Sequence, residues 1–236
     1  MKKVVHLSIR HQPLDIRIFK KECITLKKNN YDVTYIVPHE EDKVIQGIKI
    51  VALKKFTKTK YNVLFNIPNS LIKSISVKAD IYHIHDPELI PIGIILKIIG
   101  KKLIYDVHEN YPKEILEKKW PYSLKLLISS IFTLNEFFAS VFFDHIIAVI
   151  PQIGDKFPHK KTSIIRNVPI LGSIDNVVPV NYKTKNTILV YQGGITKLRG
   201  IKNIILALEF LKDPVEFWIF GKWEKNLLED CKKLKV

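Results

Sequence analysis

The chain has 236 residues, 47% of them hydrophobic, which is enough apolar material for one large globular domain or for one domain and part of another. Its 38 Lys and Arg against 23 Asp and Glu give a formal net charge of +15, which favours an anionic partner such as phosphates, lipid headgroups or nucleic acid. Two distant cysteines give no support to a disulfide framework or a zinc finger, and the apolar run between Lys3 and Arg10 is too short for a secretory signal, so we expect a cytoplasmic protein.

Apolar runs of strand length alternate with longer helical patterns through the first 167 residues. Asp15 is a suitable N-cap for a helix to Lys28, which Asn29 and Asn30 close. Pro87 suits the first turn of a helix through Ile99, followed by Gly100. Several strands are apolar on both faces, so the alternation predicts an α/β fold with a doubly wound parallel sheet. The expected strands are residues 4–9, 32–38, 48–54, 79–85, 102–108, 145–150 and 162–167.

Prolines, Gly172 and polar residues interrupt this rhythm at residues 168–186, which we interpret as a linker. The alternation then restarts with a strand and turn, a helix, a strand and a final helix. Because a three-layer domain needs more than two strands, we expect the second domain, 187–236, to be incomplete. The restarted elements are residues 187–194, 199–211 and 215–221, followed by a helix to the end.

Polar side chains end two neighbouring predicted strands, so they project at the carboxyl edge of the sheet, where ligands bind. Three interpretations stay open for them. In the first, they are metal ligands, since imidazole and carboxylate suit zinc or manganese. In the second, they are structural residues, with His83 in the core and Asp86 capping the helix that begins at Pro87. In the third, they line a polar pocket, for which His108 and Glu109 are best placed. The candidate metal ligands are His83, His85, Asp86, His108 and Glu109.

Four short motifs occur in a recognisable order: HIHDPE, YDVHENYP, IIRNVPI and GGITKLRGI. Together they resemble the retaining GT-B glycosyltransferases of glycosyltransferase family 4, over nearly the whole chain. The resemblance implies two Rossmann-like domains that face each other across a cleft. The N-terminal domain, 1–167, would bind a saccharide or lipid-linked acceptor, and the C-terminal domain would hold a nucleotide-diphosphate sugar. It further implies a role in cell-surface polysaccharide or lipopolysaccharide synthesis, with no metal and no other cofactor.

Carried over residue by residue, the resemblance places His108 beside the donor sugar, with Glu109 next to it. It makes His85 and Asp86 candidates for orienting the acceptor or supporting His108. The loop after the first strand has no glycine, but DIRIF resembles a variant motif in which Arg17 meets phosphate. Without the family, Arg17 is a solvated residue in the first turn of a helix.

In the C-terminal part, a loop that resembles the diphosphate-binding loop of the family departs from its pattern, since Gly194 replaces an Arg and Arg199 replaces a Lys. Its glycines, its basic residues and the helix that follows still suit a diphosphate. The family's paired glutamates would lie beyond Val236, so we expect a fragment, a truncated gene or a chain that a partner completes. The donor-binding candidates are Arg17, Gly193, Gly194, Lys197, Arg199 and Gly221.

Residues 121–143 predict a long apolar helix, in which Ser130, Thr133, Glu136 and Ser140 share one face. Such a helix either covers the sheet or lies on an anionic membrane surface on the cytoplasmic side, where the basic run 54–65 would help or would only be a solvated loop.

Two other classes of function stay open. One is a non-catalytic binder of anions, although nucleic acid is disfavoured because the positive charge is spread over the chain and no Arg-rich recognition helix is present. The other is a different GT-B enzyme, such as a nucleotide-sugar epimerase, which would need no acceptor.

Overall fold

The computed structural model describes residues 1–57, 59–170 and 187–234. The chain forms two compact units, Met1–Ser173 and Ile174–Val236, called here the N-terminal and C-terminal units. Most of the predicted linker, residues 171–186, lies outside the described residues. Each unit is therefore described by itself.

The N-terminal unit is built on one eight-stranded sheet with the strand order β3-β4-β2-β1-β5-β6-β7-β8. Every neighbouring pair is parallel except β3 and β4, an antiparallel hairpin at one edge. The seven strands predicted for this part are present, but the purely parallel sheet needs correction, because the sequence pattern does not reveal the three-residue β3. The strands are β1 (Lys3–Leu7), β2 (Asp32–Pro38), β3 (Lys43–Ile45), β4 (Ile48–Leu53), β5 (Ile81–Ile84), β6 (Lys102–Val107), β7 (His145–Ala148) and β8 (Thr162–Ile164).

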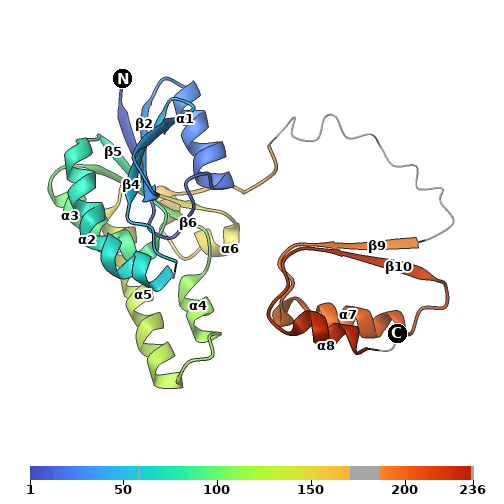
Figure 1. The fold of residues 1–236 in the computed structure, drawn as a ribbon. Helices are drawn as coiled ribbons and strands as arrows, with labels where there is room; N and C mark the ends of the chain where they lie inside the picture. The colour runs from blue at the N-terminus through green and yellow to red at the C-terminus, as the bar shows by residue number, and fades with distance from the viewer. Residues whose placement is uncertain (58, 171–186, 235–236) are drawn as a thin grey trace. The chain divides into compact units, whose positions relative to one another are not determined.

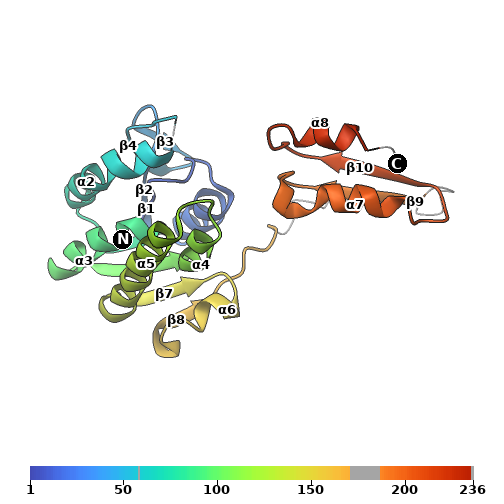
Figure 2. The same ribbon diagram turned by 90° about the horizontal axis from the view of Figure 1, so that it is seen from below.

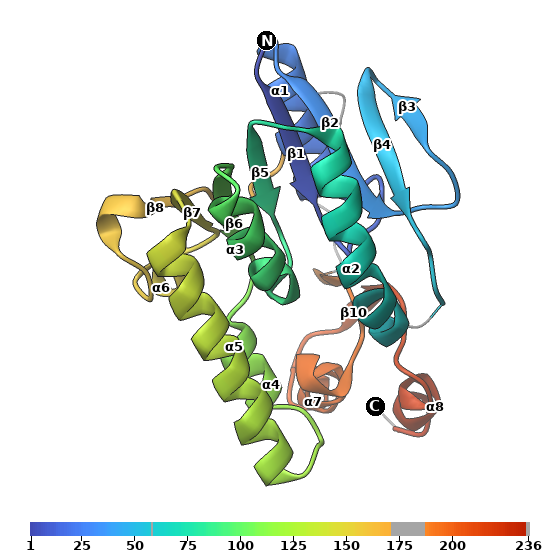
Figure 3. The same cartoon turned by 90° about the vertical axis from the view of Figure 1, so that its left-hand side faces the viewer.

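Helices cover both faces of this sheet (Figures 1 and 3). They are η1 (Ile16–Cys23, π-helical), α1 (Ile24–Lys28), α2 (Thr59–Val77), η2 (Pro87–Leu89, 3₁₀), α3 (Ile90–Ile98), α4 (Tyr111–Leu116), α5 (Tyr122–Phe142), α6 (Pro151–Gly154) and η3 (His159–Lys161, 3₁₀). On one face, strand residues such as Val5 and Tyr82 pack with α2, α3 and α5 in the larger core. On the other face, Tyr35 packs with Phe19 of η1 in a second core.

The strand order changes direction beside β1, which pairs with β2 on one side and β5 on the other. This is the topological switch point of the sheet, and the carboxyl ends of strands at such a point form a natural crevice for ligands.

Local signals placed several element ends correctly. The Asp15 side chain accepts hydrogen bonds from the backbone N–H groups of Arg17 and Ile18, so it is the predicted N-cap of η1. Asn30 and Gly100, which follow α1 and α3, both have positive φ angles, as the predicted helix endings require.

Helix α2 corrects the interpretation of the basic run 54–65 as a loop, because residues from Thr59 onward are helical. Asn62 and Asn66 attach this helix to the preceding segment: Asn62 accepts from Phe56 N–H, and Asn66 donates to the Lys54 carbonyl. The lysines and the internal Pro68 hide the helical pattern in the sequence.

Within residues 187–234, the C-terminal unit has two parallel strands, with helices packed on one face of the pair (Figures 1 and 2). The small core on that face consists of Ile195, Ile201, Leu227 and Cys231. On the opposite face, Trp218 and Phe220 are exposed. The elements are β9 (Thr187–Gln192), η4 (Lys197–Arg199, 3₁₀), α7 (Ile201–Leu208), β10 (Val215–Phe220) and α8 (Leu227–Lys232).

Candidate active site

Five polar residues gather where β1, β5 and β6 end. His6 and His83 are register partners on β1 and β5, and His85 follows two residues after His83 on the same face. Asp106 of β6 and His108, just beyond it, point to the same face, which η1 covers. The sequence analysis expected His85 and His108 to meet at this edge, and the structure brings them within hydrogen-bonding distance, at 3.3 Å between Nδ1 of His85 and Nε2 of His108.

Asp106 is the buried centre of this group. Its carboxylate accepts two hydrogen bonds from Arg17, at 2.9 Å from Nε and 2.8 Å from Nη2, and lies 3.3 Å from Nε2 of His108. Burial alone would raise the pKa of Asp106, but hydrogen bonds from His108, His85 and Arg17 outweigh it and hold the pKa well below its usual range. The ionised carboxylate therefore orients the His108 ring through its Nε2 atom.

Arg17 is not the solvated first-turn residue that was the alternative in the sequence analysis, since only 4% of it is exposed. Besides Asp106, its guanidinium donates to the Ile165 carbonyl at 3.1 Å and lies 3.1 Å from Oε1 of Glu22. These partners occupy three of the five N–H donors of the guanidinium. The predicted phosphate contact of Arg17 stays a prediction, and the contacts seen here give this residue a role inside the N-terminal unit.

The histidines form a hydrogen-bonded series from the interior to the surface. Nδ1 of His6 lies 2.9 Å from Nε2 of His85, and His85 reaches His108 through its other ring nitrogen. Burial lowers the pKa of His85 to about 3 and that of His6 well below its usual value, so both rings are neutral at pH 7. His108 is the partly exposed member of this series.

Asp86 corrects the capping hypothesis. It occupies the position before η2, but its side chain makes no capping hydrogen bond. Instead it accepts from Ser8 Oγ at 2.8 Å and from Ile9 N–H at 2.6 Å, and it lies 3.3 Å from Nδ1 of His11. A carboxylate thus holds the glycine-free loop after β1, and the His11 ring packs 5.3 Å from the His108 ring.

Glu109 is exposed and lies outside the buried group. It interacts with Glu114 of α4, and burial together with this like-charged neighbour raises the pKa of Glu114. The structure therefore does not place Glu109 with the histidines, and its catalytic role stays a prediction.

Three residues of the site escaped the sequence analysis: His6, His11 and Glu22. His6 lies inside an apolar strand, where a single histidine is usually interpreted as a core residue. Glu22 lies in a helix beside Lys20 and Lys21, where a glutamate is usually interpreted as a surface residue. The register of His6 opposite His83, which only the sheet reveals, is the signal that would have found it.

Two cavities lie near these polar residues. One, of about 470 Å³, opens on the η1 side; it is lined by Ile81, Ile104 and Ile147 and reaches His6, His83 and Glu22. The other, of about 350 Å³, lies between α4 and α5 and combines aromatic rings with charged groups, as a saccharide site does. Its lining includes Arg10, Glu88, Tyr111, Lys118, Trp120 and Phe132.

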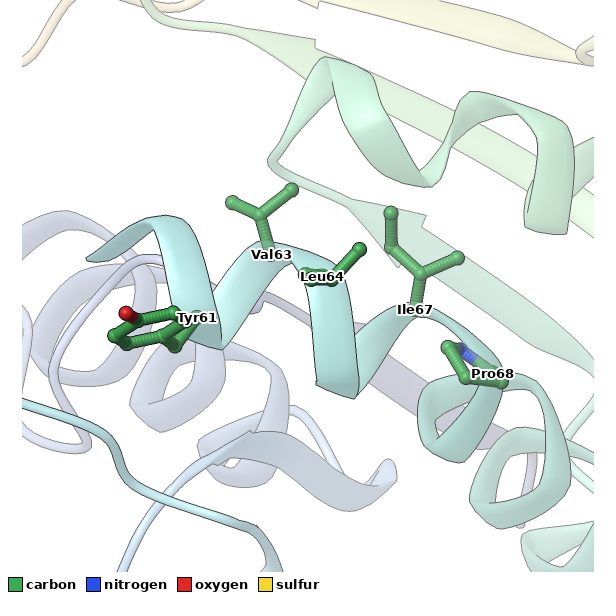
Figure 4. A pocket seen from close by; sticks show the side chains of 5 residues that line it. All are labelled: Tyr61, Val63, Leu64, Ile67 and Pro68. Atoms are coloured by element: carbon green, nitrogen blue, oxygen red, sulfur yellow. The ribbon is translucent and has the colours of Figure 1, made fainter. Parts of the chain in front are cut away.

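A further cavity of about 580 Å³ lies along α2 (Figure 4). Its five lining side chains are Tyr61, Val63, Leu64, Ile67 and Pro68, all from one helix. It is larger than those two cavities, but none of the histidines or carboxylates of the site lines it, so we do not place chemistry there.

Helix α5 is inverted in polarity relative to an ordinary surface helix, because it buries polar residues and exposes apolar ones. Glu136, Ser129 and Ala139 are buried against the N-terminal unit, and Glu136 forms an ion pair with Lys156. Of the predicted polar face, Glu136 therefore points inward. The apolar residues mostly face outward, among them Leu127, Ile131, Leu134, Phe137 and Val141. Among the described residues, α5 is also the one helix that is long and apolar enough to cross a membrane by length and composition.

The predicted donor loop follows β9 in the C-terminal unit. Gly193 has a φ of 147°, and a Cβ at Gly221 would lie 1.7 Å from the Gly193 carbonyl oxygen, so the ends of the two strands approach too closely for any other residue at 221. Lys197 and Arg199 are exposed in η4, and the Lys197 N–H donates to the Glu224 carboxylate at 2.9 Å. A diphosphate at this loop would compete with that carboxylate.

Comparison with known proteins identifies the architecture. No family model and no curated sequence matches the chain. Among solved structures, sucrose-phosphate synthase from Thermosynechococcus elongatus is 12% identical, with a TM-score of 0.68 over 96% of this chain and 64% of that one. HepE from Anabaena, in complex with UDP and glucose, is 12% identical, with a TM-score of 0.59 over 99% of this chain and 64% of that one.

The lipopolysaccharide outer core galactosyltransferase WaaB is 13% identical, with a TM-score of 0.55 over 98% of this chain and 63% of that one. The chain thus spans a little under two thirds of the length of these three proteins. Its fold is α/β of the GT-B type, the architecture that these glycosyltransferases share.

Proposed function

We propose that this protein takes part in retaining glycosyl transfer from a nucleotide-diphosphate sugar to a saccharide or lipid-linked acceptor. The observation that carries the proposal is the hydrogen-bonded series of His85, His108 and Asp106 at the switch point of a GT-B-type fold. Family 4 membership, which the sequence motifs suggested, and a role in cell-surface polysaccharide synthesis belong to the same proposal.

In the proposed reaction, an acceptor hydroxyl oxygen bonds to the donor anomeric carbon while the bond from that carbon to the diphosphate oxygen breaks. The proton of the hydroxyl passes to the departing diphosphate, so no side chain acts as base and no metal is needed at the sugar. Lys197 and Arg199 would stabilise the leaving diphosphate by their charge. His108, oriented by Asp106, would hydrogen bond the donor sugar and position it.

The cavity between α4 and α5 supports an acceptor site on the N-terminal unit. Tyr111, Trp120 and Phe132 offer faces for a sugar ring, and Arg10 with Glu88, 3.0 Å apart, offers hydrogen-bonding groups. Arg10 follows the loop that Asp86 holds, which connects this cavity to the histidines.

A lipid-linked acceptor would explain the inverted helix α5. Its outward apolar residues would enter the boundary of a bilayer, while Lys118 and Lys119 before the helix would attract anionic headgroups. Because Glu136 and Ala139 anchor the other side of α5 in the fold, we propose that the helix lies on the cytoplasmic membrane surface and does not span it.

Transfer is tested by incubating the protein with a panel of UDP-, GDP- and ADP-sugars and measuring the nucleoside diphosphate released, with and without lipid-linked saccharides. We expect release by the wild-type full-length protein, about 100-fold slower release by its His108→Ala variant, and unchanged nucleotide affinity in that variant. His159→Ala changes an exposed histidine of η3 and serves as the matched control. Release that is equal in both variants would remove His108 from the mechanism.

The same assay separates the alternatives. Interconversion of the sugar without any acceptor would indicate an epimerase. Retention on heparin that modest salt abolishes, with no affinity for sugar nucleotides, would indicate a non-catalytic anion binder.

Membrane contact is tested separately by sedimentation with vesicles of phosphatidylglycerol and phosphatidylethanolamine. We expect Phe137→Ser and Leu127→Ser to lose vesicle binding, whereas Phe210→Ser, which changes a still more exposed apolar residue of the C-terminal unit, keeps it. Equal binding by all three variants would contradict docking through α5.

A further inference from the structure

A group of potential metal ligands lies deeper in the fold than His108. Apart from His85, the proposed transfer does not use these residues. Four residues, called here the inner cluster, come from β1, η1, β5 and the position just after β5: His6, Glu22, His83 and His85. Each offers one ligand atom, and all four atoms lie within 4.8 Å of one another. Three neutral imidazoles with one carboxylate form a donor set that suits zinc.

The distances in the inner cluster fit an ion. Nδ1 of His6 lies 2.9 Å from Nε2 of His85, and Oε2 of Glu22 lies 3.6 Å and 3.7 Å from these two nitrogens. A triangle with these sides has a circumradius of about 2.0 Å, which is the length of a zinc–nitrogen or zinc–oxygen bond. We propose that the inner cluster is a zinc site, with His6, Glu22 and His85 as three ligands and His83 as the fourth.

Burial supports this assignment. Oε2 of Glu22 is buried and has no hydrogen-bond partner among the described residues, although it points between His6 and His85. A buried carboxylate oxygen without a partner is costly, and a bound cation removes that cost. The other oxygen of Glu22 is held by Arg17 at 3.1 Å, which orients the carboxylate as an outer-shell partner does.

The neighbouring group of His85, Asp106 and His108 also has ligand spacing. It is a poorer site, because Arg17 already makes two hydrogen bonds to the Asp106 carboxylate. Nor does the set proposed from the sequence hold together, since the exposed Glu109 and the Asp86 that binds the loop after β1 lie outside both groups.

The cavity of about 470 Å³ on the η1 side reaches three of the four ligands and provides a path for the ion. Four protein ligands leave no open position, so the zinc would be structural and would not activate water. The zinc would affect the candidate active site through His85. Nε2 of His85 would be fixed as a metal ligand, while Nδ1 of the same ring lies 3.3 Å from Nε2 of His108. Only this consequence rests on the proposed function.

The test uses the full chain, stripped with a chelator and then titrated with Co²⁺, whose visible spectrum is intense in a tetrahedral site. We expect one equivalent to bind with a tetrahedral spectrum, and Zn²⁺ to displace it. Glu22→Gln is the variant of choice because the amide keeps the size and shape of the Glu22 side chain but removes the anionic ligand oxygen. It should lower the metal affinity by about 100-fold, as His83→Ala should.

His159→Ala, which removes an exposed histidine, should bind cobalt as the wild type does. X-ray absorption of the zinc-loaded wild type gives a readout that needs no variant, with three imidazoles and one oxygen expected at about 2.0 Å. An octahedral cobalt spectrum in the wild type, or a cobalt affinity in folded Glu22→Gln equal to that of the wild type, would overturn the proposal. Because these readouts involve no sugar nucleotide, a failure of the transfer assay leaves them unaffected.

Discussion

The two units repeat the same order of strand, loop and helix but fix their candidate residues by different means. The N-terminal unit buries an eight-stranded sheet between two cores, and all eight histidines of the chain lie in it. Within residues 187–234, the C-terminal unit has two strands and a core of four buried residues. Where burial is deep, side chains are held by ion pairs and hydrogen bonds. Where it is shallow, the backbone and its glycines set the geometry, and the charged side chains stay in solvent.

The largest expected difference is in independent stability. A chain of residues 1–170 should unfold cooperatively in urea, because its cores are complete within it. A chain of residues 187–236 should show no cooperative transition, since two strands and a small core are marginal in water. Circular dichroism during denaturation measures both. A sharp transition in the second chain would contradict the comparison.

One arginine in each unit tests this difference in burial. Arg17→Ala leaves the buried Asp106 carboxylate without its guanidinium and should destabilise the N-terminal unit by about 3–5 kcal/mol. Arg199→Ala changes an exposed side chain and should alter stability by less than about 0.5 kcal/mol while weakening the binding of a nucleoside diphosphate. Urea denaturation and calorimetric titration with UDP give the two readouts, and equal destabilisation by both variants would refute the distinction.

Two glycines of the donor loop test the role of the backbone. A Cβ at Gly221 would collide with the Gly193 carbonyl oxygen, so Gly221→Ala should destabilise the C-terminal unit by about 2 kcal/mol or more. Gly194→Ala meets nothing within 4 Å and is the matched control, expected to be close to wild type. Hydrogen exchange of the β10 amides reports on this unit. Similar exchange in the two variants would show that the close approach is not required.

The smallest expected effect is the pH dependence of the His11–Asp86 pair. Burial lowers the pKa of His11, but the hydrogen bond and charge of Asp86 outweigh it, so the folded pKa lies above 6.5. The stabilisation is therefore fully present below pH 6.5 and is lost as the pH rises through the folded pKa. His11→Gln should be less stable than wild type at pH 6, by about 1.5 kcal/mol, the lower bound for a charged hydrogen bond.

The difference in unfolding free energy between His11→Gln and wild type should shrink toward pH 9. Urea denaturation in the presence of a chelator measures it. His159→Gln, at an exposed position, should follow the wild type at every pH. A difference between His11→Gln and wild type that is constant with pH would mean that the ring is held by packing alone.

The elements predictable from the sequence are those whose signals are local. The Asp15 cap, the Asn30 ending and the apolar runs of β1, β5 and β6 depend on residues within one turn or one strand. Helix α2 was missed because lysines and Pro68 mask its period. Asp86 was misread for a related reason: it stands in a capping position, but its hydrogen bonds go to residues 76 to 78 positions away in the chain.

By itself the sequence determined the α/β alternation, its restart at residue 187 and the presence of histidines at two strand ends, because the periods of strands and helices are visible in neighbouring residues. Only the tertiary structure decided which polar groups meet. The register of His6 opposite His83, the Arg17–Asp106 ion pair and the inward face of α5 each join segments far apart in the chain. Parallel strands bring such segments together at one edge, and burial there makes each unpaired polar group too costly to leave without a partner.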